Sequence, residues 1–447
     1  MGKINKETIL EILYDWNFWQ KELDVGRERP YYLQRYEQYK ETNIVTALLG
    51  VRRSGKSYLM RQMIKKMLSQ GQRKENILMI NFEDQRFPEF YPELLNEVYQ
   101  TYYQYLQPTA LPIIFLDEIH LVPQWERWVR TMHELGKAKI VISGSSSKLL
   151  AGELATVLTG RHLDLVVFPL NFQEFLGFNG LIITNQLELI GKKVEIQRWW
   201  SEYCDWGGFP EVVISSQKKE LLLTYFDDII TKDIEKRYVL KKSEKIRSLA
   251  RFYFTNLSNP ITFNSLTTMI DTTVSTIEKY SSYLEEAHLL FFIKRFSYKV
   301  REQEKSPRKV YIIDVGLAKA VGFKSTDNFG NLAENIVALE LRRRALEHQD
   351  WEIYYWKSLR QEEVDFLIKE GLAYKQLIQV CWNLEQEKTK KREIAALLKA
   401  SAELACHDLL IITENKEEQE VVENKIITYL PLWKWLLESS VSSSRTK

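Results

Sequence analysis

Cysteine is scarce in this sequence, and the three cysteines, Cys204, Cys381 and Cys406, show neither a pairing pattern nor the spacing of metal ligands. A disulfide framework and a zinc site are therefore not expected. The sequence also lacks a run of about eighteen apolar residues that would cross a bilayer, and the apolar segment of a secretory signal. We expect a cytoplasmic protein whose cysteines are buried, small apolar residues.

Net charge is almost absent as well, at +2 over 447 residues, of which 45% are hydrophobic and 27% charged. This composition is typical of a soluble globular chain with three or four domains. The charge is uneven, because residues 231–310 hold 16 Lys and Arg against 9 Asp and Glu. That surplus of +7 leaves the rest of the chain at −5. An acidic partner such as double-stranded DNA would therefore bind within residues 241–308.

One glycine-flanked loop organises the chain. The apolar run 46–49 predicts a buried strand, and residues 50–57 then fit the pattern G-x-x-x-x-G-K-[ST]. In such a loop the backbone N–H groups surround phosphate oxygens, Lys56 reaches the β- and γ-phosphates, and the Ser57 hydroxyl joins Mg²⁺. Apolar residues at helical spacing over 59–68 predict a helix whose positive end faces the phosphates. The predicted nucleotide-binding residues are Gly50, Val51, Arg52, Arg53, Ser54, Gly55, Lys56, Ser57 and Tyr58.

Two adjacent carboxylates follow a second apolar run. Residues 113–116 predict a buried strand that ends in Asp117 and Glu118. After a phosphate-binding loop, this pattern predicts that Asp117 holds Mg²⁺ and that Glu118 polarises the attacking water. Because neighbouring side chains of a strand point to opposite faces, the two carboxylates are expected to take different roles.

Three further strands are expected, over residues 76–83, 139–142 and 163–168. The first ends in the polar run 83–86, which either faces the ligand or is solvated loop charge. The second ends in hydroxyl residues that include Ser143 and Ser145, which would contact the γ-phosphate or its water. Arg161 precedes the last strand, where it either reaches a neighbouring subunit's nucleotide or complements a helix end. Before the loop, aromatic residues within 16–36 either cover the base or pack onto the core.

Together, the segments GVRRSGKS, LDEIH, SGSSS, LTGRH, FPLNFQEFL and GGFPEVV resemble a prokaryotic family of AAA+ ATPases with a restriction-nuclease-like C-terminal half. The resemblance spans about residues 40–435 and implies ATP and Mg²⁺ as ligands. It implies that Ser143 or Ser145 is sensor 1 and that Arg161 falls where an arginine finger would, a role that requires a neighbouring subunit and hence a homo-oligomer. The GGFP segment resembles the motif in which a proline packs on adenine, which assigns that contact to Pro210.

Residues 243–300 resemble a winged helix, with its second helix over 272–280 and a basic wing that contains Lys294, Arg295, Lys299 and Arg301. This wing would either contact DNA phosphates without sequence specificity or dock onto a protein. The order of elements beyond residue 310 resembles the PD-(D/E)XK nuclease fold. Glu340 and Asp365 match its first two positions, but Gln379 and Cys381 stand where the last charged ligand and the lysine belong. Because Mg²⁺ needs carboxylate charge, we expect a degenerate site without cleavage activity.

The expected fold class is α/β: a P-loop parallel sheet, a helical lid, a winged helix and a nuclease-like α/β domain. The expected function is an ATPase whose nucleotide state controls the last two domains, acting on DNA. A slow signalling scaffold that recruits a protein and an ATP-driven nuclease are the alternatives. The expected segments are residues 1–40 (lead-in), 41–175 (AAA+ core), 176–240 (lid), 241–308 (winged helix), 309–438 (nuclease-like domain) and 439–447 (disordered tail).

Overall fold

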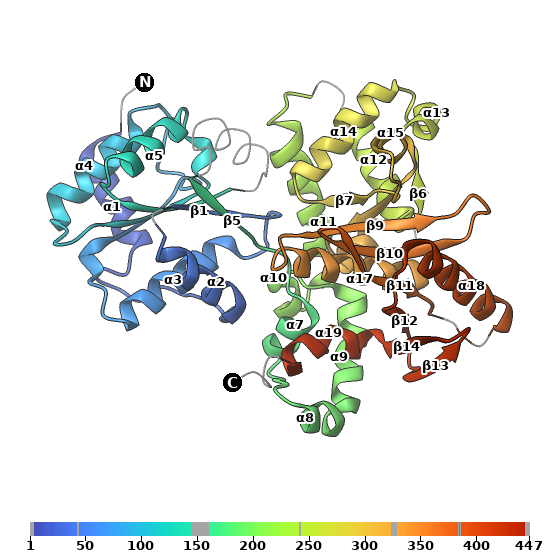
Figure 1. The fold of residues 1–447 in the computed structure, drawn as a ribbon. Helices are drawn as coiled ribbons and strands as arrows, with labels where there is room; N and C mark the ends of the chain where they lie inside the picture. Colours follow the sequence, from blue (N-terminus) through green and yellow to red (C-terminus); the bar gives the residue numbers. More distant parts are fainter. Residues whose placement is uncertain are drawn as a thin grey trace. The chain divides into compact units, whose positions relative to one another are not determined.

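The computed structural model describes residues 4–42, 44–144, 161–240, 243–322, 329–382, 384 and 386–442. The chain divides into two compact units (Figure 1). The first unit comprises residues 1–168 together with 286–288, and the second comprises the remainder. No helix within the described ranges is long and apolar enough to span a membrane.

The first unit is a parallel sheet with the strand order β2-β3-β4-β1-β5. Alternate residues of its strands enter two separate hydrophobic clusters, one on each face. Helices α1, α4 and α5 cover one face, and α2 and α3 cover the other (Figure 1). The bounds are β1 Val45–Leu49, β2 Ile77–Asn81, β3 Ile113–Asp117, β4 Lys139–Ser143, β5 His162–Val166, α1 Lys6–Trp16, α2 Pro30–Lys40, α3 Lys56–Ser69, η1 Lys74–Asn76, α4 Leu94–Leu106, η2 Ile119–Leu121 and α5 Trp125–Glu134.

All five strands predicted for this unit are present, and the aromatic lead-in packs onto the core. Phe18, Tyr32 and Tyr36 are buried in the cluster beside α3, while Trp16 and Trp19 pack against the opposite cluster. Of the two alternatives for the lead-in, core packing is therefore the one observed.

The second unit contains two sheets. The smaller sheet has the order β6-β8-β7, and the larger has the order β13-β14-β12-β11-β10-β9. The helices up to residue 255 are α7 Phe172–Phe178, α8 Gln186–Gly191, α9 Lys193–Trp206, α10 Pro210–Ile214, α11 Lys218–Asp228, the π-helix η4 Ile229–Glu235 and α12 Ser243–Thr255. The smaller sheet and its helices are β6 Pro260–Ile261, η5 Asn264–Leu266, α13 Thr267–Ile270, α14 Val274–Glu286, β7 Leu290–Ile293, α15 Val300–Lys305, β8 Arg308–Ile312 and α16 Val315–Val321. The rest are α17 Phe329–Ala345, β9 Trp351–Lys357, β10 Glu363–Glu370, β11 Ala373–Val380, α18 Glu387–Leu404, β12 Leu409–Thr413, β13 Glu418–Val422, β14 Lys425–Pro431 and α19 Leu432–Ser442.

Strand β8 belongs to the smaller sheet, where it pairs antiparallel with β6 and β7. The expected boundary between residues 308 and 309 therefore falls inside this strand. The order α12, β6, η5, α13, α14, β7, α15, β8 places a short helix, α15, between the last two strands. The winged-helix assignment stays a prediction. Residues 294–296 also pair with β9 of the larger sheet, because Phe296 N donates to Tyr355 O at 2.7 Å and Tyr355 N donates to Lys294 O at 3.1 Å.

The Gly207-Gly208 turn lies close to Leu170 and Asp314. Gly208 O accepts from Leu170 N at 2.6 Å, and Gly208 N donates to Asp314 Oδ2 at 2.7 Å. A Cβ on Gly208 would lie 2.1 Å from Leu170 O, which is backbone and cannot move aside easily. The segment 207–213 is thus fixed within the second unit by main-chain contacts.

We predict that Gly208→Ala lowers the free energy of unfolding by about 2 kcal/mol, because the added methyl overpacks this contact. Gly177→Ala is the matched control, since nothing lies within 4 Å of a Cβ at that glycine. Urea denaturation of the full chain measures both. Equal midpoints for the two variants would contradict the assigned packing.

Candidate active site

The loop between β1 and α3 adopts backbone conformations with positive φ, which glycine accommodates more easily than other residues do. Gly50 has φ +143°, and a Cβ there would lie 2.2 Å from Val167 O, just beyond β5. Gly55 has φ +97° and precedes the first residue of α3. Arg53 adopts φ 68° without being a glycine. These positions bend the chain sharply and leave the first N–H groups of α3 without partners in the helix, as an anion-binding loop requires.

The Lys56 ammonium lies within this loop. It donates to Gly50 O at 3.0 Å and to Val51 O at 3.1 Å, and the side chain is buried. Ser54 Oγ is also buried and has no hydrogen-bond partner among the described residues. Tyr58 is 43% exposed, and its ring lies against Gly26 rather than in the core. The loop therefore holds a cation and a spare hydroxyl, which fits the polyanionic end of a nucleotide.

Asp117 ends β3 and is fully buried. Its carboxylate accepts hydrogen bonds from Ser143 Oγ and Ser57, and from Asn81 Nδ2 at 3.0 Å. Burial raises the pKa of Asp117, while the hydrogen bonds from Ser143 and Ser57 lower it. Ser57 and Asp117, which the sequence assigns separately to Mg²⁺, are thus in contact, and oxygens of this kind are the ligands that Mg²⁺ prefers. Their metal-binding role stays a prediction.

Glu118 follows directly but leaves the strand geometry, with a left-handed backbone at φ 53°. The side chain is separated from that of Asp117 by this turn and not by the strand alternation that we expected. Glu118 Oε2 lies 3.3 Å from His120 Nδ1. Burial raises the pKa of Glu118 to about 7, against the opposing charges of Lys56 and Arg52. A carboxyl that titrates near neutral pH is suited to act as a general base.

Ser143 links the Asp117 carboxylate to the main chain of Glu118. Its hydroxyl donates to Asp117 Oδ1 and accepts from Glu118 N at 3.0 Å. The γ-phosphate role that we expected for this serine stays a prediction, and Ser145 lies outside the described residues. Ser143 therefore holds the Asp117 carboxylate and the backbone of Glu118 together at the carboxyl end of the sheet.

The polar run 83–86 resolves into two parts. Glu83 Oε1 pairs with Arg52 Nη1 of the loop at 2.9 Å. Asp84 and Arg86 instead pair with each other at 2.7 Å. Glu83 thus pairs with the ligand loop, whereas Asp84 and Arg86 form an ion pair to which Asp15 also contributes.

Sequence reasoning missed Asn81, His120 and Arg29. Arg29 is buried just before α2, and its Nη1 donates to Ser54 O and Phe168 O, both at 3.0 Å. It therefore ties the loop to the end of the β5 segment. A last polar residue on a buried strand could have signalled Asn81, but nothing local in the sequence marks the long-range contacts of Arg29.

Arg161 does not lie near the loop of its own chain. It directly precedes β5, and its carbonyl accepts from Val45 N at the start of β1, whereas the loop follows the other end of β1. Its guanidinium pairs with Glu134, and 46% of the side chain is exposed. Five strand residues, roughly 17 Å, separate the two edges of the sheet. Any contact of Arg161 with nucleotide would have to be in a second copy, and this role stays a prediction.

Pro210 is the first residue of α10 in the second unit, and it is half-buried. Its contact with adenine stays a prediction.

The degenerate nuclease site stays a prediction. Glu340 pairs with Arg344 at 2.9 Å, one turn further along α17. The helix glutamate that shares a cation with Asp365 is Glu334. Gln379 lies beside Asp365, because Gln379 Oε1 accepts from Asp365 N at 3.3 Å, and Cys381 is buried. Glu340 lies next to Arg343 as well, at 3.7 Å.

A buried lysine in a glycine loop, a serine and an aspartate in contact, and a glutamate at the same sheet edge define a P-loop ATPase domain of the AAA type. In agreement, residues 42–176 match the family model described as "AAA domain". Residues 197–327 and 329–435 match models described as "Domain of unknown function (DUF8612)" and "Domain of unknown function (DUF4143)".

Two relatives extend over most of the chain. "Uncharacterized protein MJ1544" of Methanocaldococcus jannaschii is 36% identical over 414 residues, which cover 88% of each chain. An "Uncharacterized protein" of Haemophilus influenzae is 32% identical over 419 residues, covering 92% of this chain and 98% of that protein. The chain belongs to the family of AAA-domain proteins that includes these two. Among solved structures, the Walker-type ATPase paby2304 of Pyrococcus abyssi aligns with a TM-score of 0.44 and 14% identity, covering 66% of this chain and 95% of that one.

Proposed function

We propose that the first unit binds ATP with Mg²⁺ at residues 50–58 and hydrolyses it. The observation that carries this proposal is the contact of Ser57 and Ser143 with Asp117 at the edge where Lys56 fills the glycine loop. Ser57 and Asp117 would hold Mg²⁺, which when bound neutralises phosphate charge.

The chain's own groups then have distinct roles. Lys56 exchanges its two carbonyl acceptors for phosphate oxygens, a stronger charge-assisted interaction. Glu118 accepts a proton from the attacking water, and His120 at 3.3 Å holds that carboxyl in place. Arg161 of a second copy and Pro210 are proposed to contact the transferred phosphoryl group and the adenine, respectively.

The titration of Glu118 gives a test of this proposal. Only the ionised carboxylate accepts a proton, so kcat/KM for ATP hydrolysis should rise as the pH increases through about 7. The pKa of Glu118 is higher in the folded protein than in the unfolded chain, so protonation of Glu118 stabilises the fold. This stabilisation is fully present below about pH 4.5 and is lost as the pH rises through about 7. Phosphate release measured between about pH 5.5 and 8.5 tests the rate, and a flat profile would contradict the role of Glu118.

We further propose that nucleotide state controls the second unit and that its larger sheet is nuclease-like without cleavage activity. The neutral Gln379 beside Asp365 supports the loss of cleavage. Control of a protein partner is favoured over DNA, because the basic wing carries its own counter-charges. Glu304 pairs with Lys294 and with Arg308, and Glu302 pairs with Lys299. If residues 241–308 bound duplex DNA and the binding weakened with salt, DNA would be favoured over a protein partner. Metal-dependent DNA cleavage would instead favour the ATP-driven nuclease.

A further inference from the structure

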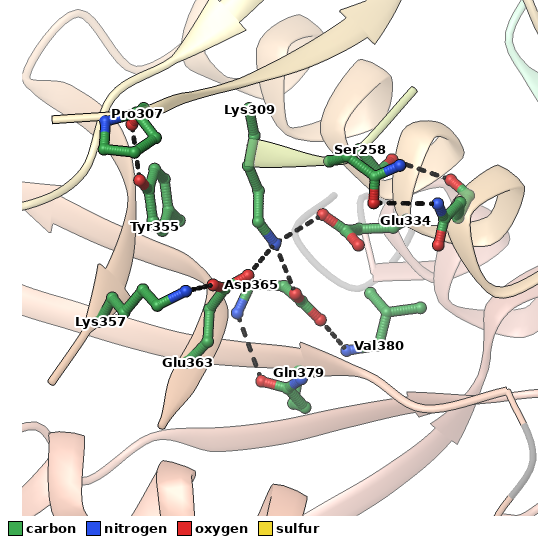
Figure 2. A network of polar contacts seen from close by, with 12 residues as sticks. Ser258, Pro307, Lys309, Glu334, Tyr355, Lys357, Glu363, Asp365, Gln379 and Val380 are labelled. Atoms are coloured by element: carbon green, nitrogen blue, oxygen red, sulfur yellow. Dashed lines mark hydrogen bonds and ion pairs between the residues drawn. The ribbon is translucent and has the colours of Figure 1, made fainter. Parts of the chain in front are cut away.

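Lys309 is a lysine in the interior of the second unit. It projects from β8, and only 2% of its side chain is exposed. Its Nζ lies 2.9 Å from Glu334 Oε1 on α17, and 2.8 Å from both Glu363 Oε1 and Asp365 Oδ1 on β10 (Figure 2). Lysine is almost never buried to this extent unless it is paired, so this carboxylate cluster is a specific feature of the interior.

The three carboxylates match the donors of the ammonium one for one. A lysine ammonium has three N–H donors, and each has an acceptor from a different residue. Other groups complete the cluster: Tyr311 OH donates to Glu334 Oε1 at 2.8 Å, Lys357 Nζ lies 3.0 Å from Glu363 Oε2, and Val380 N donates to Asp365 Oδ2 at 3.0 Å. The cluster is therefore satisfied by protein groups alone.

Charge balance in the cluster depends on the Lys309 ammonium. Glu334, Glu363 and Asp365 surround this single buried ammonium, and Lys357 is a second cation that pairs with Glu363. Removing the Lys309 charge would leave buried carboxylate charge without compensation, which is strongly unfavourable.

The three acidic side chains of the cluster face one cation, the Lys309 ammonium. Three carboxylate oxygens from two elements converge on one point, and such ligands suit Mg²⁺ and Mn²⁺. Yet no set of His, Cys, Asp or Glu side chains in the described ranges is arranged to hold a metal ion. The point of convergence is already occupied by the Lys309 ammonium (Figure 2).

We propose that the Lys309 ammonium takes the place of a metal ion in this carboxylate cluster. In the native chain the lysine blocks the position, and a divalent cation binds there once the lysine charge is removed. The ammonium joins β8 of the smaller sheet to α17 and β10, so it links the two sheets of the second unit without a metal ion. The proposal rests on contacts within the second unit alone and does not depend on the ATPase assignment.

The test replaces Lys309 with methionine, which has similar length and no charge. Mn²⁺ binding to the nucleotide-free full chain is measured by electron paramagnetic resonance. Lys309→Met should bind Mn²⁺ at least tenfold more tightly than wild type, and Lys309→Arg, which keeps the charge, should not. Adding Asp365→Asn to Lys309→Met should abolish the gain. A folded Lys309→Met protein with wild-type affinity, or a gain that survives Asp365→Asn, would overturn the proposal.

Lys309→Met is also expected to be unstable without metal, because it leaves buried carboxylates unbalanced. If it does not fold, refolding is repeated in Mn²⁺ and, separately, in NaCl of the same ionic strength. Recovery of the native circular dichroism spectrum in Mn²⁺ only supports the proposal. Failure to recover in either solution, or equal recovery in both, overturns it.

Discussion

Glu118→Gln should lower the rate of ATP hydrolysis at least 100-fold while leaving ATP affinity unchanged or slightly increased. A general base contributes about 10²- to 10⁴-fold to a rate, and glutamine has the shape of glutamate without its ability to accept the proton. The buried Glu118 carboxyl is within the field of Lys56, so removing negative charge there does not weaken the binding of an anion. Steady-state phosphate release and equilibrium titration with a fluorescent ATP analogue measure the two quantities.

The matched control for this variant is Glu93→Gln, an exposed glutamate that precedes α4 in the same unit. It should retain the wild-type rate. Glu118→Gln should also not lower the thermal midpoint, since it removes a carboxyl whose burial disfavours the charged form. If ATP affinity and hydrolysis fell together, Glu118 would be supporting the loop and not the chemical step.

Lys56→Met should weaken ATP binding about 100-fold, which corresponds to roughly 3 kcal/mol for the loss of a charge-assisted contact. The methionine keeps the apolar stem that packs under the loop but cannot donate to phosphate. Lys65→Met on the exposed face of α3 removes the same charge from the same helix and should bind ATP as wild type does. Isothermal titration with a non-hydrolysable ATP analogue measures both. Equal affinities for the two variants would show that long-range charge, and not the loop contact, binds the nucleotide.

The first unit could be predicted from sequence almost completely, because parallel strands buried on both faces are continuous apolar runs. Each of the five runs ends close to where its strand ends, and the polar residues that follow are the site residues Asp117, Glu118 and Ser143. The local sequence pattern thus predicted most residues of the candidate active site. The left-handed turn at Glu118 and the contact of Arg29 with Ser54 were not predictable, because they depend on tertiary contacts between distant segments.

The second unit was harder because its important contacts join separate elements. Glu340 was assigned to the degenerate site together with Asp365, but it pairs with Arg344 one turn later, and Glu334 is the glutamate of α17 that shares a cation with Asp365. Lys309 reaches Asp365 from a strand 56 residues earlier in the chain, and no spacing rule connects them. Strand β13 was also missed, because its mixed polar sequence lacks the apolar run of a buried strand.

The central claim is that the first unit hydrolyses ATP with the loop and carboxylates described above. The most direct measurement is phosphate release from ATP by the purified full chain, in Mg²⁺ and after Mg²⁺ is removed with a chelator. We predict release that requires Mg²⁺, because Ser57 and Asp117 form the proposed metal site. Phosphate release that does not exceed the buffer blank in Mg²⁺, or release that persists undiminished in the chelator, would contradict this account.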